Sequence, residues 1–211
     1  MSAEASPRLP RYTVAITGAS GALYAVRTVA ALLEQGCELD LVVSDYGRRL
    51  LVDELGKEAA LERLMPYLQQ KYGAGVARGR VEVLSNRDLG ATIASGSRPT
   101  KGMVIVPCSM KSLAGVANGL SRNLVERAAD VMLKERKPLV LVPRETPMSL
   151  PQLRNMVLCA EAGAVVLPAM PGFYHLPATL DDLADFLAGK ILSALGLEQR
   201  LCADWTGRVE R

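Results

Sequence analysis

The chain alternates between short apolar runs and longer stretches in which apolar residues recur with helical spacing. The apolar runs, rich in Val, Ile and Leu, occupy residues 12–17, 38–44, 102–108, 138–143 and 164–169. Runs that are apolar at nearly every position are typical of strands in a sheet that is covered on both faces. Between them, helices are predicted at residues 20–35, 45–56, 58–72, 122–136, 149–162 and 179–195. This alternation predicts one α/β domain with a doubly wound parallel sheet.

Residues 73–101 interrupt this alternation. They contain VEVL (81–84), which predicts a short strand, and then a loop rich in Gly and Ser. A loop of this length in a compact domain is usually functional or mobile. Residues 1–10 lack the apolar stretch of a signal peptide and are predicted to form a flexible tail. We therefore expect the domain at residues 11–198, with a second tail at 199–211.

Polar and glycine-rich segments follow the five predicted strands. In chain order they read GASGA, SDYG, SMKS, RETP and MPGFYH. The carboxyl ends of parallel strands share one edge of the sheet, and ligands bind in the crevices at that edge. We therefore expect these segments to meet in one ligand site.

The first of these segments lies in ITGASGALYA, residues 16–25, which is close to a dinucleotide-binding loop without matching it. That pattern requires glycine at positions 18, 20 and 23, and the chain has Gly18, Ser20 and Leu23 there. The acid expected further along would be Asp40, but it lies inside a predicted strand, which weighs against a nicotinamide dehydrogenase. Ser20 is either the N-cap of the next helix or a hydroxyl donor that, with the helix amides, binds a monophosphate.

The segment PCSMKSLAGVANG, residues 107–119, repeats this arrangement. Ser109 and Ser112 place two hydroxyls, with Lys111 between them, where the backbone turns into a helix. The alternative is an ordinary N-cap beside a solvated lysine. Two such loops at one sheet edge favour an anionic ligand.

Composition excludes several classes of function. Aromatic residues make up only 4% of the chain and its net charge is +3, without a basic block, which argues against a nucleic-acid-binding surface. No apolar run approaches membrane-spanning length. The four cysteines, Cys37, Cys108, Cys159 and Cys202, form no CxxC pair and are interpreted as buried residues in a reducing cytoplasm. With His175 as the sole histidine, no metal site is expected.

Several motifs, in order, resemble one family. ITGASGA, the long segment from ASGSRPTKGMVIVPCSMKS to LVLVPRETPMS, and AGAVVLPAMPGFYH are similar to the UbiX/Pad-type flavin prenyltransferases, over about residues 12–198. The resemblance implies a Rossmann/flavodoxin-like fold and binding of FMN. It also implies transfer of a dimethylallyl group from dimethylallyl monophosphate to N5 and C6 of reduced FMN, without a metal.

The same resemblance implies partners and a setting. The product would be prenylated FMN, delivered to a UbiD-type decarboxylase of ubiquinone or aromatic acid metabolism. The family forms homododecamers with active sites at subunit interfaces, in the cytoplasm, so neither nucleic acid nor a membrane is expected as a partner.

The resemblance also assigns residues by position. FMN would be bound by Gly18, Ala19, Ser20, Ser44, Ser109, Met110, Lys111, Ser112 and Arg144. At position 112 the family more often has threonine, which keeps the hydroxyl. Dimethylallyl phosphate would be bound by Arg127, Lys134, Arg144, Glu145, Tyr174 and Lys190, some of them from a neighbouring subunit. The catalytic residues would be Ser20, Glu54 and Glu145.

These residue types suit the chemistry. Cationic side chains stabilise a departing phosphate, and Glu145 can donate and accept the protons that move. Each also has a structural alternative. Lys134 ends a helix, Arg144 and Glu145 could pair in a loop, Glu54 could be a solvated acid, and Lys190 could extend to solvent. His175 is predicted to be structural.

One motif resembles a metal-binding signature but is interpreted as a helix cap. DDLAD (181–185) has the form of the magnesium-diphosphate motif of helical prenyl synthases, but it follows Thr179 at a predicted helix start. Acids are favoured there, and Asp182 can complete a capping box with Thr179.

Two other activities remain as alternatives within this fold. A flavin-dependent cysteine decarboxylase would have a histidine in the N-terminal half and a PASANT-like motif, and this chain has neither. A non-catalytic flavin-binding protein would lack the cations predicted for the phosphate pocket.

Overall fold

The computed structural model describes residues 9–202, so most of the first predicted tail and residues 203–211 of the second lie outside the described chain. Six parallel strands form one sheet in the order β3-β2-β1-β4-β5-β6. The strands are β1 (Arg11–Ile16), β2 (Glu38–Val43), β3 (Arg80–Leu84), β4 (Met103–Cys108), β5 (Leu139–Pro143) and β6 (Val165–Val166). The doubly wound parallel sheet is thereby confirmed, and its order reverses between β1 and β4.

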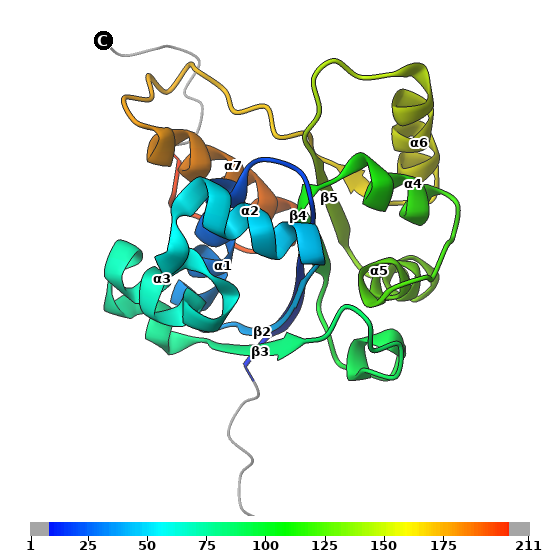
Figure 1. Ribbon diagram of the computed structural model, residues 1–211, viewed down its shortest axis with the longest axis horizontal. Coiled ribbons are helices and arrows are strands. Elements are labelled where there is room, and N and C mark those ends of the chain that lie inside the picture. Colours follow the sequence, from blue (N-terminus) through cyan, green and yellow to red (C-terminus); the bar gives the residue numbers. More distant parts are fainter. Residues whose placement is uncertain (1–8, 203–211) are drawn as a thin grey trace, which may run out of the picture.

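Helices cover both faces of the sheet (Figure 1). Their bounds are α1 (Ala22–Glu34), α2 (Asp45–Leu55), α3 (Leu64–Tyr72), α4 (Met110–Ala117), α5 (Leu124–Lys134), α6 (Leu150–Glu161) and α7 (Leu180–Ala194). On one side α1 packs against α7, and on the other α4 packs against α5 and α6.

The central strands are apolar at successive positions because each face has its own core. In β4, Val104 and Val106 pack with α1 and α7, whereas Met103 and Ile105 pack with α4 and α5. All four side chains are fully buried. This explains why the strands read as continuous apolar runs rather than as an alternating pattern.

The predicted helix at 58–72 is wrong in its first part. Two 3₁₀ turns, Lys57–Ala59 and Leu61–Arg63, precede α3. Pro66 lies in the first turn of α3, where its missing N–H costs nothing, and it marks a helix start. The last strand is also shorter than predicted, and the strand at 81–84 is confirmed within β3.

Asp40 of β2 is buried between two arginines. Its carboxylate accepts hydrogen bonds from Arg11 Nη1 at 2.8 Å and from Arg98 Nη2 at 2.9 Å. The side chain of Asp40 has no exposed surface. It therefore neutralises the arginines and is not available to bind a ribose, as the acid of a dinucleotide site does.

No helix within residues 9–202 combines the length and the apolar character needed to cross a bilayer.

Candidate functional site

A groove of about 420 Å³ lies at the carboxyl edge of the sheet, where the strand order reverses. It is lined by Thr17, Gly18, Ser44, Asp45, Tyr46, Asn86, Ser109, Lys111, Ser112, Asn123, Val125 and Glu126. We call this cavity the groove. Five predicted FMN-binding residues line it, namely Gly18, Ser44, Ser109, Lys111 and Ser112.

Three helices begin at the groove. Their N-caps are Ser44 for α2, Ser109 for α4 and Asn123 for α5. Each cap side chain accepts a hydrogen bond from a backbone amide of its own first turn, at 3.0–3.2 Å. Helix N-termini carry partial positive charge and unpaired N–H groups, so three of them converging on one cavity favour an anionic ligand.

Two glycines allow α2 to begin beside the end of β1. A Cβ at Gly18 would lie 2.6 Å from Tyr46 Cβ, and a Cβ at Gly47 would lie 2.5 Å from the carbonyl oxygen of Ile16. Neither position has room for a side chain. The close approach brings Ser44 next to the β1–α1 loop.

Some groove residues come from distant segments and were not predicted from the sequence. Asn86, which follows β3, accepts the amide of Val125 through its side chain at 3.2 Å and the amide of Leu124 through its backbone at 2.9 Å. Glu126 is buried, and its Oε2 accepts the amide of Arg122 at 3.0 Å. A single Asn or Glu carries no signal for such a contact, although N-R-D is typical of a turn.

The N-terminus of α1 is occupied by the chain's own carboxylate. Glu54, near the end of α2, accepts the amides of Gly21 and Ala22 at 3.0 and 2.8 Å. The N-cap is Gly21 and has no side-chain cap, so the interpretation of Ser20 as the N-cap is wrong. The amides that hold a pyrophosphate in dinucleotide-binding proteins are therefore bonded to Glu54.

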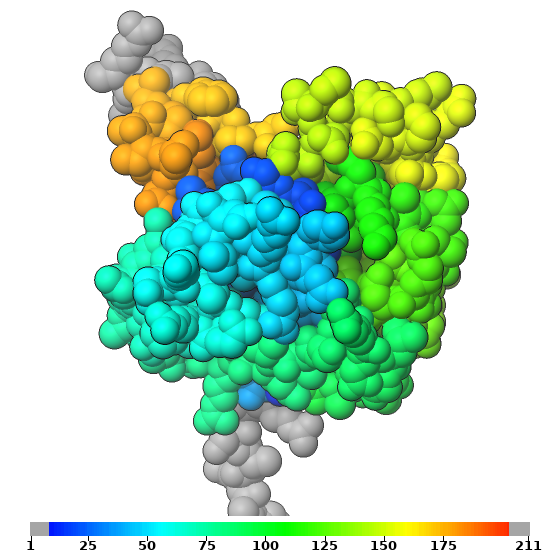
Figure 2. Space-filling view, in the orientation of Figure 1, coloured from blue at the N-terminus to red at the C-terminus, as the bar shows by residue number. Residues whose placement is uncertain are grey.

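A second cavity, of about 320 Å³, lies on the other side of the β1–α1 loop. It is lined by Ser20, Gly21, Leu23, Tyr24, Glu54, Arg144, Ala169, Leu180 and Leu183. We call it the notch, and Figure 2 shows a depression here, with blue β1–α1 residues at its base between orange and yellow-green segments. Arg144 Nε donates to the carbonyl oxygen of Ser20 at 3.1 Å.

The remaining FMN candidates lie near these cavities without lining them. Ala19 is buried between Gly18 and Ser20, and Met110 is the half-buried first residue of α4.

Glu145 follows Arg144, and its Oε1 accepts the amide of Thr146 at 3.0 Å. Arg144 thus bonds to the β1–α1 loop, and the predicted alternative of a loop ion pair with Glu145 is not what the structure contains.

Tyr174 and Lys190 gather around Phe186 of α7. The Tyr174 ring lies edge-on to Phe186 at 5.7 Å, and Lys190 Nζ lies 5.6 Å from the centre of that ring. His175 stacks on Phe186 with the ring centres 5.0 Å apart, and its ring lies edge-on to Tyr174 at 5.8 Å. This packing agrees with the structural interpretation of His175. Tyr174 itself is 38% exposed.

Two predicted phosphate ligands lie apart from both cavities. Arg127 donates to the carbonyl oxygen of Ala94 at 3.1 Å and to Asp130 at 2.7 Å. Lys134, at the end of α5, contacts Glu135 at 2.8 Å. Neither lines the groove or the notch. Glu145, Tyr174 and Lys190 do not line them either, so a single chain does not bring all the predicted residues together.

The DDLAD carboxylates all have protein partners. Asp182 forms the predicted capping box with Thr179. Hydrogen bonds from the backbone amides of Thr179 and then Ala178 lower the pKa of Asp182. Asp181 pairs with Lys71 at 3.0 Å, and Asp185 pairs with Arg27.

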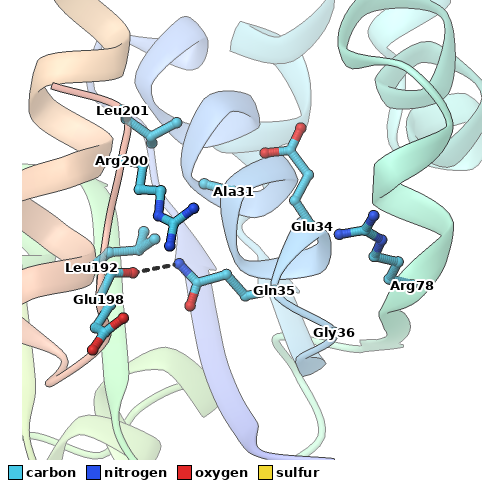
Figure 3. Close-up of a pocket in the computed structure, with 9 residues that line it drawn as sticks. All are labelled: Ala31, Glu34, Gln35, Gly36, Arg78, Leu192, Glu198, Arg200 and Leu201. Atoms are coloured by element: carbon cyan, nitrogen blue, oxygen red, sulfur yellow. Dashed lines mark hydrogen bonds between the residues drawn. The ribbon is translucent and has the colours of Figure 1, made fainter.

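A larger cavity, of about 600 Å³, lies at the opposite, amino edge of the sheet (Figure 3). It is lined by the end of α1, Arg78, and residues of and after α7, and Gln35 donates to the carbonyl oxygen of Glu198 there. None of the predicted site residues lines it. Size alone therefore does not identify the functional site.

Comparisons with known proteins identify the family of the chain. The Flavoprotein family model matches residues 2–190. The flavin prenyltransferase UbiX of Halalkalibacterium halodurans is 46% identical over 194 residues, which cover 92% of each chain.

Solved structures are similar over nearly the whole chain. The crystal structure of AnUbiX in complex with FMN and dimethylallyl pyrophosphate has a TM-score of 0.84 and 36% identity, covering 95% of this chain and 100% of that one. A dodecameric FMN-dependent UbiX-like decarboxylase from Escherichia coli O157:H7 has a TM-score of 0.81 and 37% identity, covering 93% and 100%. The chain therefore belongs to the Flavoprotein family and, within it, to the UbiX flavin prenyltransferases.

Proposed function

We propose that the protein binds reduced FMN across the groove and the notch and prenylates it with dimethylallyl monophosphate. The convergence of three helix N-termini and the hydroxyls of Ser44, Ser109 and Ser112 on the groove carries this proposal. This donor set suits one phosphate group, and Lys111 adds a positive charge beside it. When bound, reduced FMN supplies the nucleophilic atoms N5 and C6.

The notch is assigned to the reacting end of the two substrates. Leu23, Tyr24, Leu180 and Leu183 give it an apolar wall, which suits a dimethylallyl group. Arg144 supplies a positive charge at the same place, and it holds Ser20 through the carbonyl oxygen. AnUbiX was crystallised with the diphosphate ester. For this protein we propose the monophosphate as the prenyl donor.

We assign the chemistry to Arg144 in the notch, to Glu145 next to it in the chain, and to Tyr174 and Lys190, which pack on Phe186 of the helix that supplies Leu180 and Leu183 to the notch. Departure of phosphate from an allylic carbon develops negative charge on the leaving oxygen, which Arg144, Tyr174 and Lys190 stabilise. Glu145 donates a proton to that phosphate and serves as a base for the proton released from the flavin ring. Ser20 and Glu54 hold the loop between the two cavities, and the Ser20 hydroxyl relays the proton.

We assign Arg127 and Lys134 to the phosphate pocket of a neighbouring subunit. Both lie on α5, away from the notch of their own chain. The UbiX-like protein from E. coli is dodecameric, and we propose the same homododecamer here. In this assembly the site is complete only where subunits meet.

The product and its setting complete the proposal. Prenylated FMN leaves for a UbiD-type decarboxylase, and the reaction takes place in the cytoplasm. The buried thiols of Cys37, Cys108 and Cys159 agree with a reducing compartment. Burial raises the pKa of Cys37 and of Cys159 to about 11, so these thiols stay protonated near neutral pH.

Mass spectrometry of the flavin tests the whole proposal. The purified protein is incubated anaerobically with reduced FMN and dimethylallyl monophosphate, in parallel with the diphosphate and with excess chelator. We expect a flavin heavier by one five-carbon prenyl group with the monophosphate, and the same yield with chelator. An unchanged flavin mass with both donors would refute the activity, and product from the diphosphate alone would refute the donor.

A further inference from the structure

Thr17 joins the ends of the two central strands. It is 1% exposed and directly follows β1. Its hydroxyl donates to the carbonyl oxygen of Pro107 at 2.8 Å and accepts the amide of Ser109 at 2.7 Å. Its own amide also donates to Pro107, at 3.2 Å. Three hydrogen bonds therefore link this residue to the end of β4.

These bonds take the place of regular sheet hydrogen bonds between the ends of β1 and β4. The paired register between β1 and β4 ends at Ala15 and Ile105, and Pro107 has no amide with which to continue it. The regular pairing of β4 with β5 is also interrupted between Ile105 and Cys108. The Thr17 hydroxyl thus fixes the position of Ser109 where the sheet ladder does not.

The contact continues into the proposed phosphate loop. Ser109 Oγ accepts the amide of Ser112 at 3.2 Å and donates to Ser112 Oγ at 3.0 Å. The hydroxyl hydrogen of Ser109 is therefore used within the protein. The hydroxyl hydrogen of Ser112 has no acceptor among residues 9–202 and is available to an anion in the groove.

We propose that Thr17 is a positioning residue that sets the phosphate-binding geometry of residues 109–112. It does so by holding the Ser109 amide, which in turn orients the Ser112 hydroxyl and the N-terminus of α4. This inference rests on the proposed binding of the FMN phosphate in the groove. Without the Thr17 hydroxyl, the part-buried Ser109 amide loses its acceptor, and the loop must shift to find another.

Thr13, on β1 itself, provides a matched control. It is also buried, four residues before Thr17, but its Oγ1 has no hydrogen-bond partner among the described residues. Thr13→Val and Thr17→Val make the same chemical change. Only Thr17→Val removes a hydroxyl that bonds to the phosphate loop.

The experiment measures FMN affinity and melting temperature for the full-length protein and for Thr17→Val, Thr17→Ser and Thr13→Val. We expect Thr17→Val to weaken FMN binding about tenfold, the effect of losing one hydrogen bond that orients the loop near a charged ligand. Thr17→Ser should restore affinity to within about twofold, and Thr13→Val should bind FMN as the wild type does. Wild-type affinity in Thr17→Val, or failure of Thr17→Ser to restore binding, would overturn the inference.

A double-mutant cycle separates positioning from a general loss of stability. If Thr17 acts through Ser112, then Thr17→Val and Ser112→Ala should weaken FMN binding by less together than the product of their separate effects. Independent, multiplicative effects would overturn the inference. Weak FMN binding by the wild-type protein itself would instead refute the proposed function, so the two failures are distinguishable.

Discussion

The groove and the notch lie on opposite sides of one loop and differ in what they present to a ligand. The groove presents three helix N-termini, hydroxyls and Lys111, and its two carboxylates, Asp45 and Glu126, are paired with Arg87 and Arg122. The notch presents the ionisable side chains of Glu54 and Arg144, and there the helix terminus is already bonded to Glu54. A permanent anion is held well by fixed dipoles, whereas a reaction that moves protons and charge requires ionisable groups.

This contrast accounts for the departure from the dinucleotide pattern. In that pattern the second glycine lets a pyrophosphate approach the amides of the first helix. Here those amides are bonded to Glu54, so Ser20 does not obstruct a phosphate that binds at α4 instead. In the proposed site, the phosphate binds at the helices after β2 and β4 rather than at the first helix.

The largest expected effect separates chemistry from binding. Glu145→Gln keeps the size of the side chain and removes its ability to exchange a proton. We expect single-turnover prenylation to slow by about 10²- to 10⁴-fold, while FMN affinity stays within about twofold. Anaerobic rapid-mix kinetics and a separate FMN titration measure the two quantities. A wild-type rate would assign the proton transfers to the substrate phosphate.

The next effect concerns the groove alone. Ser112→Ala removes the hydroxyl that is free to donate, and hydrogen bonds to charged groups contribute about 1.5–3 kcal/mol, so FMN affinity should fall roughly 10- to 100-fold. At saturating FMN, the prenylation rate of Ser112→Ala should return to the wild-type rate. Ser193→Ala, on the exposed side of α7, serves as the control for a serine outside the site. Equal FMN affinities in the two variants would contradict the groove assignment.

A smaller effect is expected for Lys134, which lies away from the groove and the notch of its own chain. Lys134→Ala should raise the KM for dimethylallyl monophosphate about tenfold, because one cation is lost from the leaving-group phosphate. FMN affinity should not change. Arg154→Ala, which removes an exposed cation from α6, is the control. An unchanged KM would contradict the assignment of Lys134 on α5 to the substrate pocket. The proposed contribution of a neighbouring subunit would then lose its support.

The smallest effect concerns Asp182 of the DDLAD motif, which is interpreted as a helix cap and not as a magnesium site. The pKa of Asp182 is lowered in the folded protein, so its carboxylate stabilises the fold above the ordinary value of 3.8, and this contribution is lost as pH falls through the folded pKa. Asp182→Asn should therefore lower the melting temperature at pH 7, and the difference from wild type should shrink toward pH 3. Prenylation at pH 7, measured with and without chelator, should be unaffected.

Some parts of this structure could be predicted because their signals are local. Apolar runs identified the central strands, and Thr179 with Asp182 identified a helix start. Ser109 and Lys111 were assigned to the carboxyl edge because they directly follow a predicted strand. The start of α3 was missed because the pattern of apolar residues outweighed Pro66, which is itself a local signal.

Other parts depend on contacts between distant residues. Glu54 reaches a helix that begins 32 residues earlier in the chain, and Asn86 reaches a helix that begins far beyond it. No spacing rule connects such pairs. Thr17 was counted only as the end of a strand, because its hydroxyl acquires a role only when β1 and β4 lie side by side.

The buried Asp40 has a consequence for how the molecule opens. Arg98 binds it from the segment between β3 and β4, and Asn86, in the same segment, holds the start of α5 beside the groove. Detaching this segment would leave a buried carboxylate with one of its two arginines, which raises the free energy of local unfolding. We therefore expect the outer edge of the sheet and the groove to open as one cooperative unit. In hydrogen exchange, the amides of β2 and of the first turn of α5 should lose protection together.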